Sequence, residues 1–312
     1  MTKRPLCRAL SILMVGGLLL APAALFTGCF GGDKDSSNSK ESPITSLLSG
    51  NTLEAKTAAL APYVEALNGF NGHMVTFDFA ISPTLEKLHS GEQMTSLSLP
   101  RYADLQEELD KARADKSISG VYEDVDTAAD AVRAALKDLV PLTVKMESYY
   151  SSKGYLADNH AQGAQMAQQF IPLQDAFDAA YGKLDAIVSA HNKELRAAQL
   201  EQLKSEGKKN AAAFTELNIK TRELADAAEE ETMDAASAET KIQEILALND
   251  ALENTSELSS YKGRVNDFVG SVRSLLANKT DANYNTMIES FNRLIDAANR
   301  MDVNTLDGTG KK

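Results

Sequence analysis

The chain has 312 residues, of which 44 are Asp or Glu and 32 are Lys or Arg, so its formal net charge is −12. A surface of this sign repels nucleic acid, and the composition therefore excludes nucleic acid as a partner. The length is sufficient for one large domain or two smaller ones.

The beginning of the chain predicts a secretory signal peptide over residues 1–28. Three basic residues, Lys3, Arg4 and Arg8, precede the uncharged and mainly apolar run Ala9–Phe26. The run ends in LFTGCF, residues 25–30, which resembles a bacterial lipobox, so we expect Cys29 to be lipidated. The acyl chains on Cys29 would then hold the protein on a membrane. A plain signal peptide with a chance cysteine is the alternative.

The cysteine count and the next segment agree with an anchored protein. The only other cysteine, Cys7, lies inside the signal, so a disulfide, thiol catalysis and a cysteine-ligated metal are excluded. Residues 29–51 are predicted to be the lipidated cysteine and a flexible tether rich in Gly and Ser. Phe30, in place of an aspartate, favours the outer membrane over the inner membrane. The expected location is the bacterial cell envelope, with the protein facing the periplasm.

Apolar residues at alternating spacings of three and four predict helices over residues 52–303. The faces between these stripes carry strong helix formers, and no segment shows a sustained period of two. We therefore predict an all-α fold, an elongated bundle of about six to seven helices with long antiparallel coiled-coil-like packing. The first stripe continues through Gly69 and Gly72, and Pro83 is expected to kink its far end. Residues 304–312 are predicted to be a disordered tail.

Two histidine pairs have the spacing of metal ligands. Glu86 and His89 form an E-x-x-H pair, but a di-iron bundle needs two such pairs and the second is missing. His191 and Glu194 form an H-x-x-E pair, yet His191 continues an apolar stripe. A core histidine that is hydrogen-bonded across the bundle is therefore the preferred interpretation. The sequence has no G-x-S-x-G, P-loop or G-x-G-x-x-G motif, so we expect no enzyme activity, no cofactor and no metal.

The stretch YYSSKGYLADNHAQG, residues 149–163, crowds three tyrosines with an aspartate and a histidine. One interpretation is a corner between two helices, with Gly154 in the left-handed position after the first helix and Leu156 folded back on its last turn. Asp158 would then favour the positive end of the next helix. The other interpretation is a ligand pocket lined by four side chains, those of Tyr150, Tyr155, Asp158 and His160.

These residues also carry a family resemblance. The element Tyr63, Val64 and Asn68, followed by Tyr149, Tyr150, Tyr155, Asp158 and Gly163, resembles the YiiG-like family of uncharacterised bacterial lipoproteins. The resemblance would cover roughly residues 55–300. It implies an α-helical domain of unknown function, and it implies no activity, cofactor or catalytic residue.

Taken together, these features favour a lipid-anchored helical envelope protein with a non-enzymatic role in protein interaction or envelope structure. A possible partner is another envelope protein. The alternative is a periplasmic binding module for a small ligand or metal ion, centred on the Tyr150–His160 corner.

Overall fold

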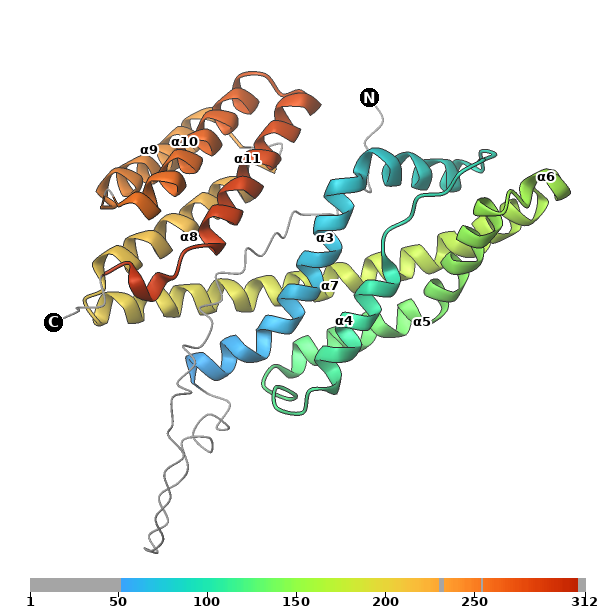
Figure 1. The fold of residues 1–312 in the computed structure, drawn as a ribbon, viewed down its shortest axis with the longest axis horizontal. Helices are drawn as coiled ribbons and strands as arrows, with labels where there is room; N and C mark the ends of the chain where they lie inside the picture. The colour runs from blue at the N-terminus through green and yellow to red at the C-terminus, as the bar shows by residue number, and fades with distance from the viewer. Residues whose placement is uncertain (1–51, 230–232, 254, 308–312) are drawn as a thin grey trace, which may run out of the picture. The chain divides into compact units, whose positions relative to one another are not determined.

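The computed structural model describes residues 52–229, 233–253 and 255–307, and it confirms the all-α fold. These residues contain no strand. They form nine α-helices and one 3-10 helix, more than the six to seven helices that the sequence predicts: α3 Leu53–Ser90, α4 Tyr102–Ala114, α5 Glu123–Ser151, α6 Tyr155–Asp158, α7 Ala161–Ser205, α8 Lys209–Glu229, α9 Ala235–Ala251, α10 Ser256–Ala277, α11 Asp281–Asn299 and η1 Val303–Thr305 (Figure 1).

The described chain divides into two compact units. Unit 1 contains residues 58–192, and unit 2 contains residues 193–307 together with residues 52–57. The division falls inside α7, between Asn192 and Lys193. The length allows one large domain or two smaller ones, and the structure has two helical units. Each unit is described by itself.

The first stripe forms one long element, as predicted, and its two inner glycines lie within α3. The helix is interrupted at Phe77, where the backbone has φ −112° and ψ 15°. The interruption therefore lies about one and a half turns before Pro83, where the sequence places the kink. A proline inside a helix lacks one backbone donor and its ring crowds the preceding turn, so the backbone can relieve this strain upstream of the proline itself.

In the sequence, one apolar stripe runs from Phe214 to Leu252 and predicts a single long helix. This prediction is wrong. The structure has two helices there, α8 and α9, with residues 230–232 outside the described part. Asp234 begins α9 because its carboxylate accepts hydrogen bonds from the backbone N–H groups of Ala236 and Ser237. A strong N-cap residue inside an apolar stripe was the sequence signal for this break.

The core of unit 1 is a cluster of aromatic rings between α3, α4 and α7. Phe70, Tyr102, Phe177 and Tyr181 are all buried, with ring centroids 5.1–5.9 Å apart. The two tyrosine hydroxyls are satisfied inside this core, since Tyr102 donates to the side chain of Gln174 and Tyr181 donates to Asn71 at 2.8 Å. Buried hydroxyls with partners fix the register of the three helices without an unpaired polar group.

A buried ionic cluster joins α3, α4 and α5 in the same unit. One oxygen of Asp126 lies 2.6 Å from the Tyr63 hydroxyl and 2.8 Å from Nη1 of Arg113. Its other oxygen accepts the backbone N–H of Gly120 at 2.9 Å. Burial, followed by the hydrogen bond to Asp126, raises the pKa of Tyr63 to about 12. Tyr63 therefore remains a neutral donor to this carboxylate at any physiological pH.

Unit 2 has its own core, formed by α8, α9, α10 and α11. The rings of Phe214 and Tyr261 lie 4.7 Å apart, and those of Phe268 and Phe291 lie 5.2 Å apart. Helices α10 and α11 are joined by residues 278–280 and pack as an antiparallel pair. Thr280 caps α11 by accepting the backbone N–H of Asn283.

The predicted disordered tail is wrong in its first part. Residues Val303–Thr305 form η1, and Leu306 is buried. The carboxylate of Asp307 accepts the backbone N–H groups of Asn210 at 2.7 Å and Ala211 at 2.9 Å. Asp307 thereby satisfies free donors at the start of α8, which is what holds this part of the tail in place. Residues 308–312 lie outside the described part.

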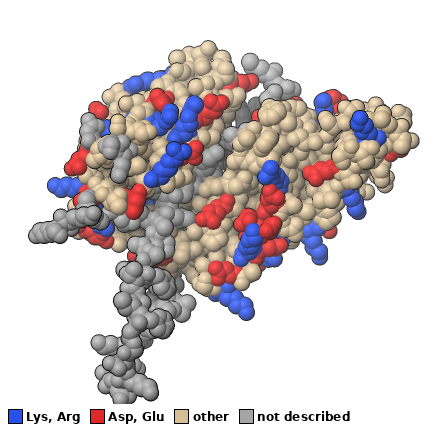
Figure 2. Space-filling view, viewed as in Figure 1, with Lys and Arg blue, Asp and Glu red and all other residues tan. Residues whose placement is uncertain are grey.

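Acidic and basic side chains are interspersed over the visible face in Figure 2. Many of them form surface ion pairs, such as Arg133 with Asp110 and Arg273 with Glu239. Among the described residues, no helix is both long and apolar enough to cross a membrane.

Candidate functional site

The stretch 149–163 forms the corner between α5 and α7, and the short helix α6 lies between them. α5 includes Tyr149 and ends at Ser151, as the apolar stripe from Val121 to Tyr149 predicts. The left-handed residue after α5 is Lys153, with φ 57°, and Gly154 has an ordinary helical conformation. The prediction of a left-handed Gly154 is therefore wrong by one residue.

The reason for a glycine at 154 is a close approach to Tyr149. A Cβ atom at this position would lie 2.6 Å from Cδ2 of the Tyr149 ring and 3.3 Å from the Tyr149 carbonyl oxygen. The position therefore requires glycine on steric grounds, whatever its φ angle. Leu156 does not fold back on α5 as predicted, because its side chain is 74% exposed.

Asp158 connects the corner to the beginning of α7. One of its carboxylate oxygens accepts the Tyr149 hydroxyl proton at 2.7 Å, and the other accepts the backbone N–H of Gln162 at 2.9 Å. These two hydrogen bonds, that of Tyr149 first, lower the pKa of Asp158. The expected interaction with the positive end of α7 is thus present through one oxygen of Asp158, and Tyr149 occupies the other.

His160 is held in an unusual backbone conformation immediately before α7. Asn159 and His160 both have positive φ angles, 53° and 69°, a region that asparagine tolerates and that most residues avoid. The backbone N–H of His160 donates to the carbonyl of Tyr155, and the two rings stack with centroids 5.1 Å apart. Local strain of this kind is retained where the surrounding structure positions a side chain.

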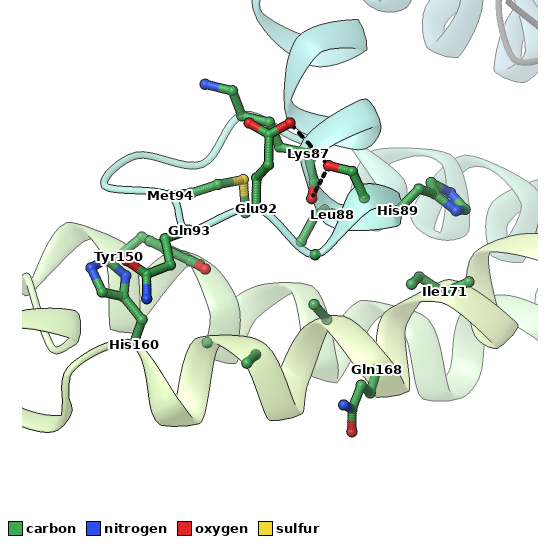
Figure 3. Close-up of a pocket in the computed structure, with 15 residues that line it drawn as sticks. Lys87, Leu88, His89, Glu92, Gln93, Met94, Tyr150, His160, Gln168 and Ile171 are labelled. Carbon is green, nitrogen blue, oxygen red and sulfur yellow. Dashed lines mark hydrogen bonds between the residues drawn. The ribbon is translucent and has the colours of Figure 1, made fainter.

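A cavity of about 330 Å³ opens beside this corner, within unit 1. One wall is the beginning of α7, with Gly163, Ala164, Ala167 and Ile171, and the other wall is the end of α3 and the segment that follows it, residues 87–94. Figure 3 shows Tyr150, His160 and Gln93 together at one end of the cavity, while the His89 ring points away from them. Small residues on α7 leave the space that these larger side chains enclose.

Two of the four residues predicted to line a pocket do so. Tyr150 and His160 face the cavity, and Nδ1 of His160 is buried without a hydrogen-bond partner in the described part of the chain. Tyr155 is buried behind His160, and Asp158 is occupied at the start of α7, so neither lines the cavity. Sequence reasoning missed the residues 87–94. Gly91, with φ 72°, marks the turn that brings buried Met94 back toward α7. No local sequence pattern shows that this turn packs against α7.

The histidine pairs do not assemble into a metal site in the described residues. No group of three or more His, Cys, Asp or Glu side chains there is placed to hold a metal ion. His191 lies 2.8 Å from the carboxylate of Asp124 on α5, so the predicted hydrogen bond is confirmed. The predicted core position is wrong, because the His191 side chain is 23% exposed and that of Asp124 is 54% exposed. His89 lies at the rim of the cavity. Cys29, the predicted lipidation site, lies outside the described residues.

Replacement of Gly163 by alanine should destabilise unit 1 and disturb the cavity. The new Cβ would lie 2.8 Å from the Tyr150 hydroxyl oxygen and 3.1 Å from Cε1 of Tyr149. We expect the free energy of unfolding to fall by about 1–2 kcal/mol, because the overpacking outweighs the gain in helix propensity. Urea unfolding followed by circular dichroism measures this change.

Gly182→Ala in the same helix is the matched control. A Cβ there meets nothing within 4 Å, so alanine should raise the free energy of unfolding by about 0.5–1 kcal/mol. The two substitutions should therefore have opposite signs. Equal effects would contradict the close approach of Tyr149 and Tyr150 to Gly163.

Comparison with known proteins places the chain in a family. Residues 60–302 match the family described as protein of unknown function (DUF3829). The chain belongs to the DUF3829 family. The match spans most of α3 through α11, so it includes both walls of the cavity and both units. No curated protein and no solved structure matches this DUF3829 chain.

Proposed function

We propose that this DUF3829 protein is a lipid-anchored, non-enzymatic protein of the bacterial cell envelope, and that unit 1 binds a small molecule in the cavity between α3 and α7. Of the two functions that the sequence leaves open, the geometry favours the binding module. A metal ion is not part of the proposal, because its ligands are not gathered in the described residues.

The observation that carries the proposal is a conformationally strained histidine, His160, at the wall of an existing cavity. The backbone around His160 is strained, its ring is fixed by stacking on Tyr155, and its buried Nδ1 has no partner in the described chain. A buried polar atom without a hydrogen bond costs about 1–3 kcal/mol. The surrounding structure bears the cost of holding His160 in this place, beside a space of a size that a small molecule can occupy.

The placement of Asp158 favours binding over catalysis. A general acid or base would have to reach a bound molecule, whereas both oxygens of Asp158 are occupied by Tyr149 and by the backbone of Gln162. The location rests on the sequence. The lipobox at residues 25–30 and the resemblance to YiiG-like lipoproteins both favour an anchor at Cys29, with the outer membrane favoured over the inner membrane.

Filling the cavity tests the binding function. Ala167 lines the cavity, so Ala167→Phe should block it, while Ala179→Phe places the same ring on an exposed position of α7. Native mass spectrometry of the chain extracted from envelopes should detect a bound small molecule with the natural chain and with Ala179→Phe, but not with Ala167→Phe. A bound species that persists in Ala167→Phe, or its absence from all three proteins, would contradict the proposal.

The anchor has its own test. Cys29→Ser removes the atom that would be acylated, so we expect the protein to leave the membrane fraction or to remain unprocessed. Cell fractionation and an immunoblot against the helical body measure both outcomes. Cys7→Ser, inside the predicted signal, is the control and should change neither. Normal processing and membrane retention of Cys29→Ser would refute lipidation.

An interaction with an envelope protein is the second candidate function, and one observation favours it. Phe79 is 77% exposed and Phe77 is 39% exposed, and both lie where α3 is interrupted. Exposed aromatic residues beside an irregular backbone are typical of contact surfaces. A photo-crosslinker at position 79 should capture one defined partner, and one at exposed Glu65 in the same helix should not.

A further inference from the structure

We propose that the cavity takes a small monocarboxylate with an apolar tail, the carboxylate lying against Tyr150, His160 and Gln93 and the tail against Leu88, Met94 and Ile171. This inference rests on the proposed binding function and names the class of ligand.

The end of the cavity at Tyr150 and His160 offers hydrogen-bond donors. The Tyr150 ring packs between Tyr149 and Tyr155, and its hydroxyl lies beside Gly163 at the cavity wall. Burial, followed by the nearby charge of Asp158, raises the pKa of Tyr150, so its hydroxyl keeps its proton at neutral pH. Nδ1 of His160 is buried, so His160 can donate through Nε2 when that nitrogen carries the proton, and the Gln93 side-chain amide supplies further N–H groups.

The acids near this end are already engaged. Asp158 accepts hydrogen bonds with both oxygens and does not line the cavity. Glu92 does line it, but its carboxylate accepts the Ser90 hydroxyl at 3.2 Å and lies on the side of Lys87 in Figure 3. Three donors without a competing carboxylate among them form a site for an anionic acceptor group, since hydrogen bonds to a charged acceptor are the stronger ones.

The remainder of the cavity is suited to an apolar tail. Leu88 and Met94 are buried, and the facing surface of α7 contributes Ala164, Ala167 and Ile171. At roughly 30 Å³ for each water-sized group, about 330 Å³ accommodates on the order of ten non-hydrogen atoms. This is the size of an eight-carbon carboxylate, which has enough length to reach from the donors to Ile171.

The test uses isothermal titration calorimetry at pH 7 with three probes of nearly equal size: octanoate, octanamide and octylamine. The protein is the chain carrying Cys29→Ser, taken from the soluble fraction, so that neither an acyl group nor detergent competes for the apolar wall. We expect octanoate to bind at least about tenfold more tightly than octanamide or octylamine, because only octanoate offers a charged acceptor to the three donors.

Substitutions at the donors make the test specific. Tyr150→Phe removes one hydroxyl and should weaken octanoate binding by about tenfold. His160→Asn should do the same, and asparagine is chosen because it tolerates the positive φ angle at this position. Tyr122→Phe removes a hydroxyl beside His191, outside the cavity lining, and should leave binding unchanged.

The outcomes separate the ligand class from the binding function. If octylamine or octanamide binds as tightly as octanoate, or if Tyr150→Phe and His160→Asn both leave octanoate binding unchanged, the carboxylate class is overturned while the cavity can still be a binding site. If none of the three probes binds, the carboxylate class also fails. The proposed binding function fails only when the chain from envelopes carries no molecule that Ala167→Phe displaces.

Discussion

Asp126→Ala should lower the free energy of unfolding of unit 1 by about 3–5 kcal/mol, the largest effect that we expect from one side chain. The substitution removes the acceptor of the Tyr63 hydroxyl at 2.6 Å and of the Gly120 backbone N–H at 2.9 Å, and the ion-pair partner of Arg113 Nη1 at 2.8 Å. Asp126 is only 8% exposed, so these contacts are buried. The loss comes chiefly from the buried donors that remain without an acceptor, and not from the ion pair itself.

The charge of Arg113 is partly compensated by a second acid, which limits the loss. Arg113 also forms a two-pronged pair with Asp130, with both nitrogen-oxygen distances at 3.0 Å. We therefore expect a value near the lower end of the range. Urea unfolding, with hydrogen exchange of α3–α5 to assign the transition to unit 1, measures the change.

Asp104→Ala is the control for Asp126→Ala. Asp104 pairs with Arg101 at 3.5 Å on the surface, where both side chains are largely exposed, and such pairs contribute at most about 1 kcal/mol. If Asp104→Ala destabilised unit 1 as much as Asp126→Ala, the ionic cluster would not be what joins α3, α4 and α5.

Asp178→Asn should stabilise unit 1 at pH 7 by about 2 kcal/mol, and the gain should disappear on acidification. Burial, together with the charge of Asp175, raises the pKa of Asp178 to about 6, while the amide of Gln174 and the charge of His89 act in the opposite direction. The unfolded chain has its ordinary carboxyl pKa near 3.9, so the difference corresponds to about 3 kcal/mol, reduced here by partial exposure.

The sign follows from the protons that each state binds. Between about pH 4 and pH 6 the folded chain binds more protons at Asp178 than the unfolded chain does, so the free energy of unfolding falls as the pH rises. Above pH 6 the buried carboxylate is charged and its full cost is present. Asparagine has no such charge, so the difference between Asp178→Asn and the natural chain should grow from pH 4 to pH 7.

Urea unfolding at pH 4, 5, 6 and 7 measures this difference. Asp138→Asn, at an exposed position of α5, is the control and should leave the pH dependence of stability unchanged. A difference between Asp178→Asn and the natural chain that is the same at every pH would show that Asp178 titrates in the folded chain as it does in the unfolded chain.

Much of the helical structure could be predicted because each helix carries its own apolar stripe. The stripe from Met166 to Leu195 predicts one long helix, and α7 is 45 residues long. The ends and interruptions of the helices were harder to predict, because each depends on a single residue. Asp234 begins α9 with its side chain, and α3 is interrupted at Phe77 and not at Pro83. A local cap or a displaced kink changes the apolar periodicity too little to be recognised.

One wall of the candidate site could be predicted from the sequence, and the other could not. The corner itself has local signals, and Tyr150 and His160 were identified from them. The opposite wall could not be identified in this way, because residues 87–94 are more than fifty residues from Tyr150 in the sequence. Only the packing of α3 against α7 brings residues 87–94 close to Tyr150. Within the corner, the sequence could not distinguish a glycine needed for its φ angle from one needed for space, and Gly154 is of the second kind.

The central claim is that the cavity beside Tyr150 and His160 binds a small molecule. Methyl-labelled methionine NMR tests it most directly, because Met94 lies in the cavity wall and Met287 is buried in unit 2. Addition of the molecules extracted from native envelopes should shift the methyl signal of Met94 in the emptied chain and leave that of Met287 unchanged. A Met94 signal that does not move, or that moves equally in Ala167→Phe, would contradict the account.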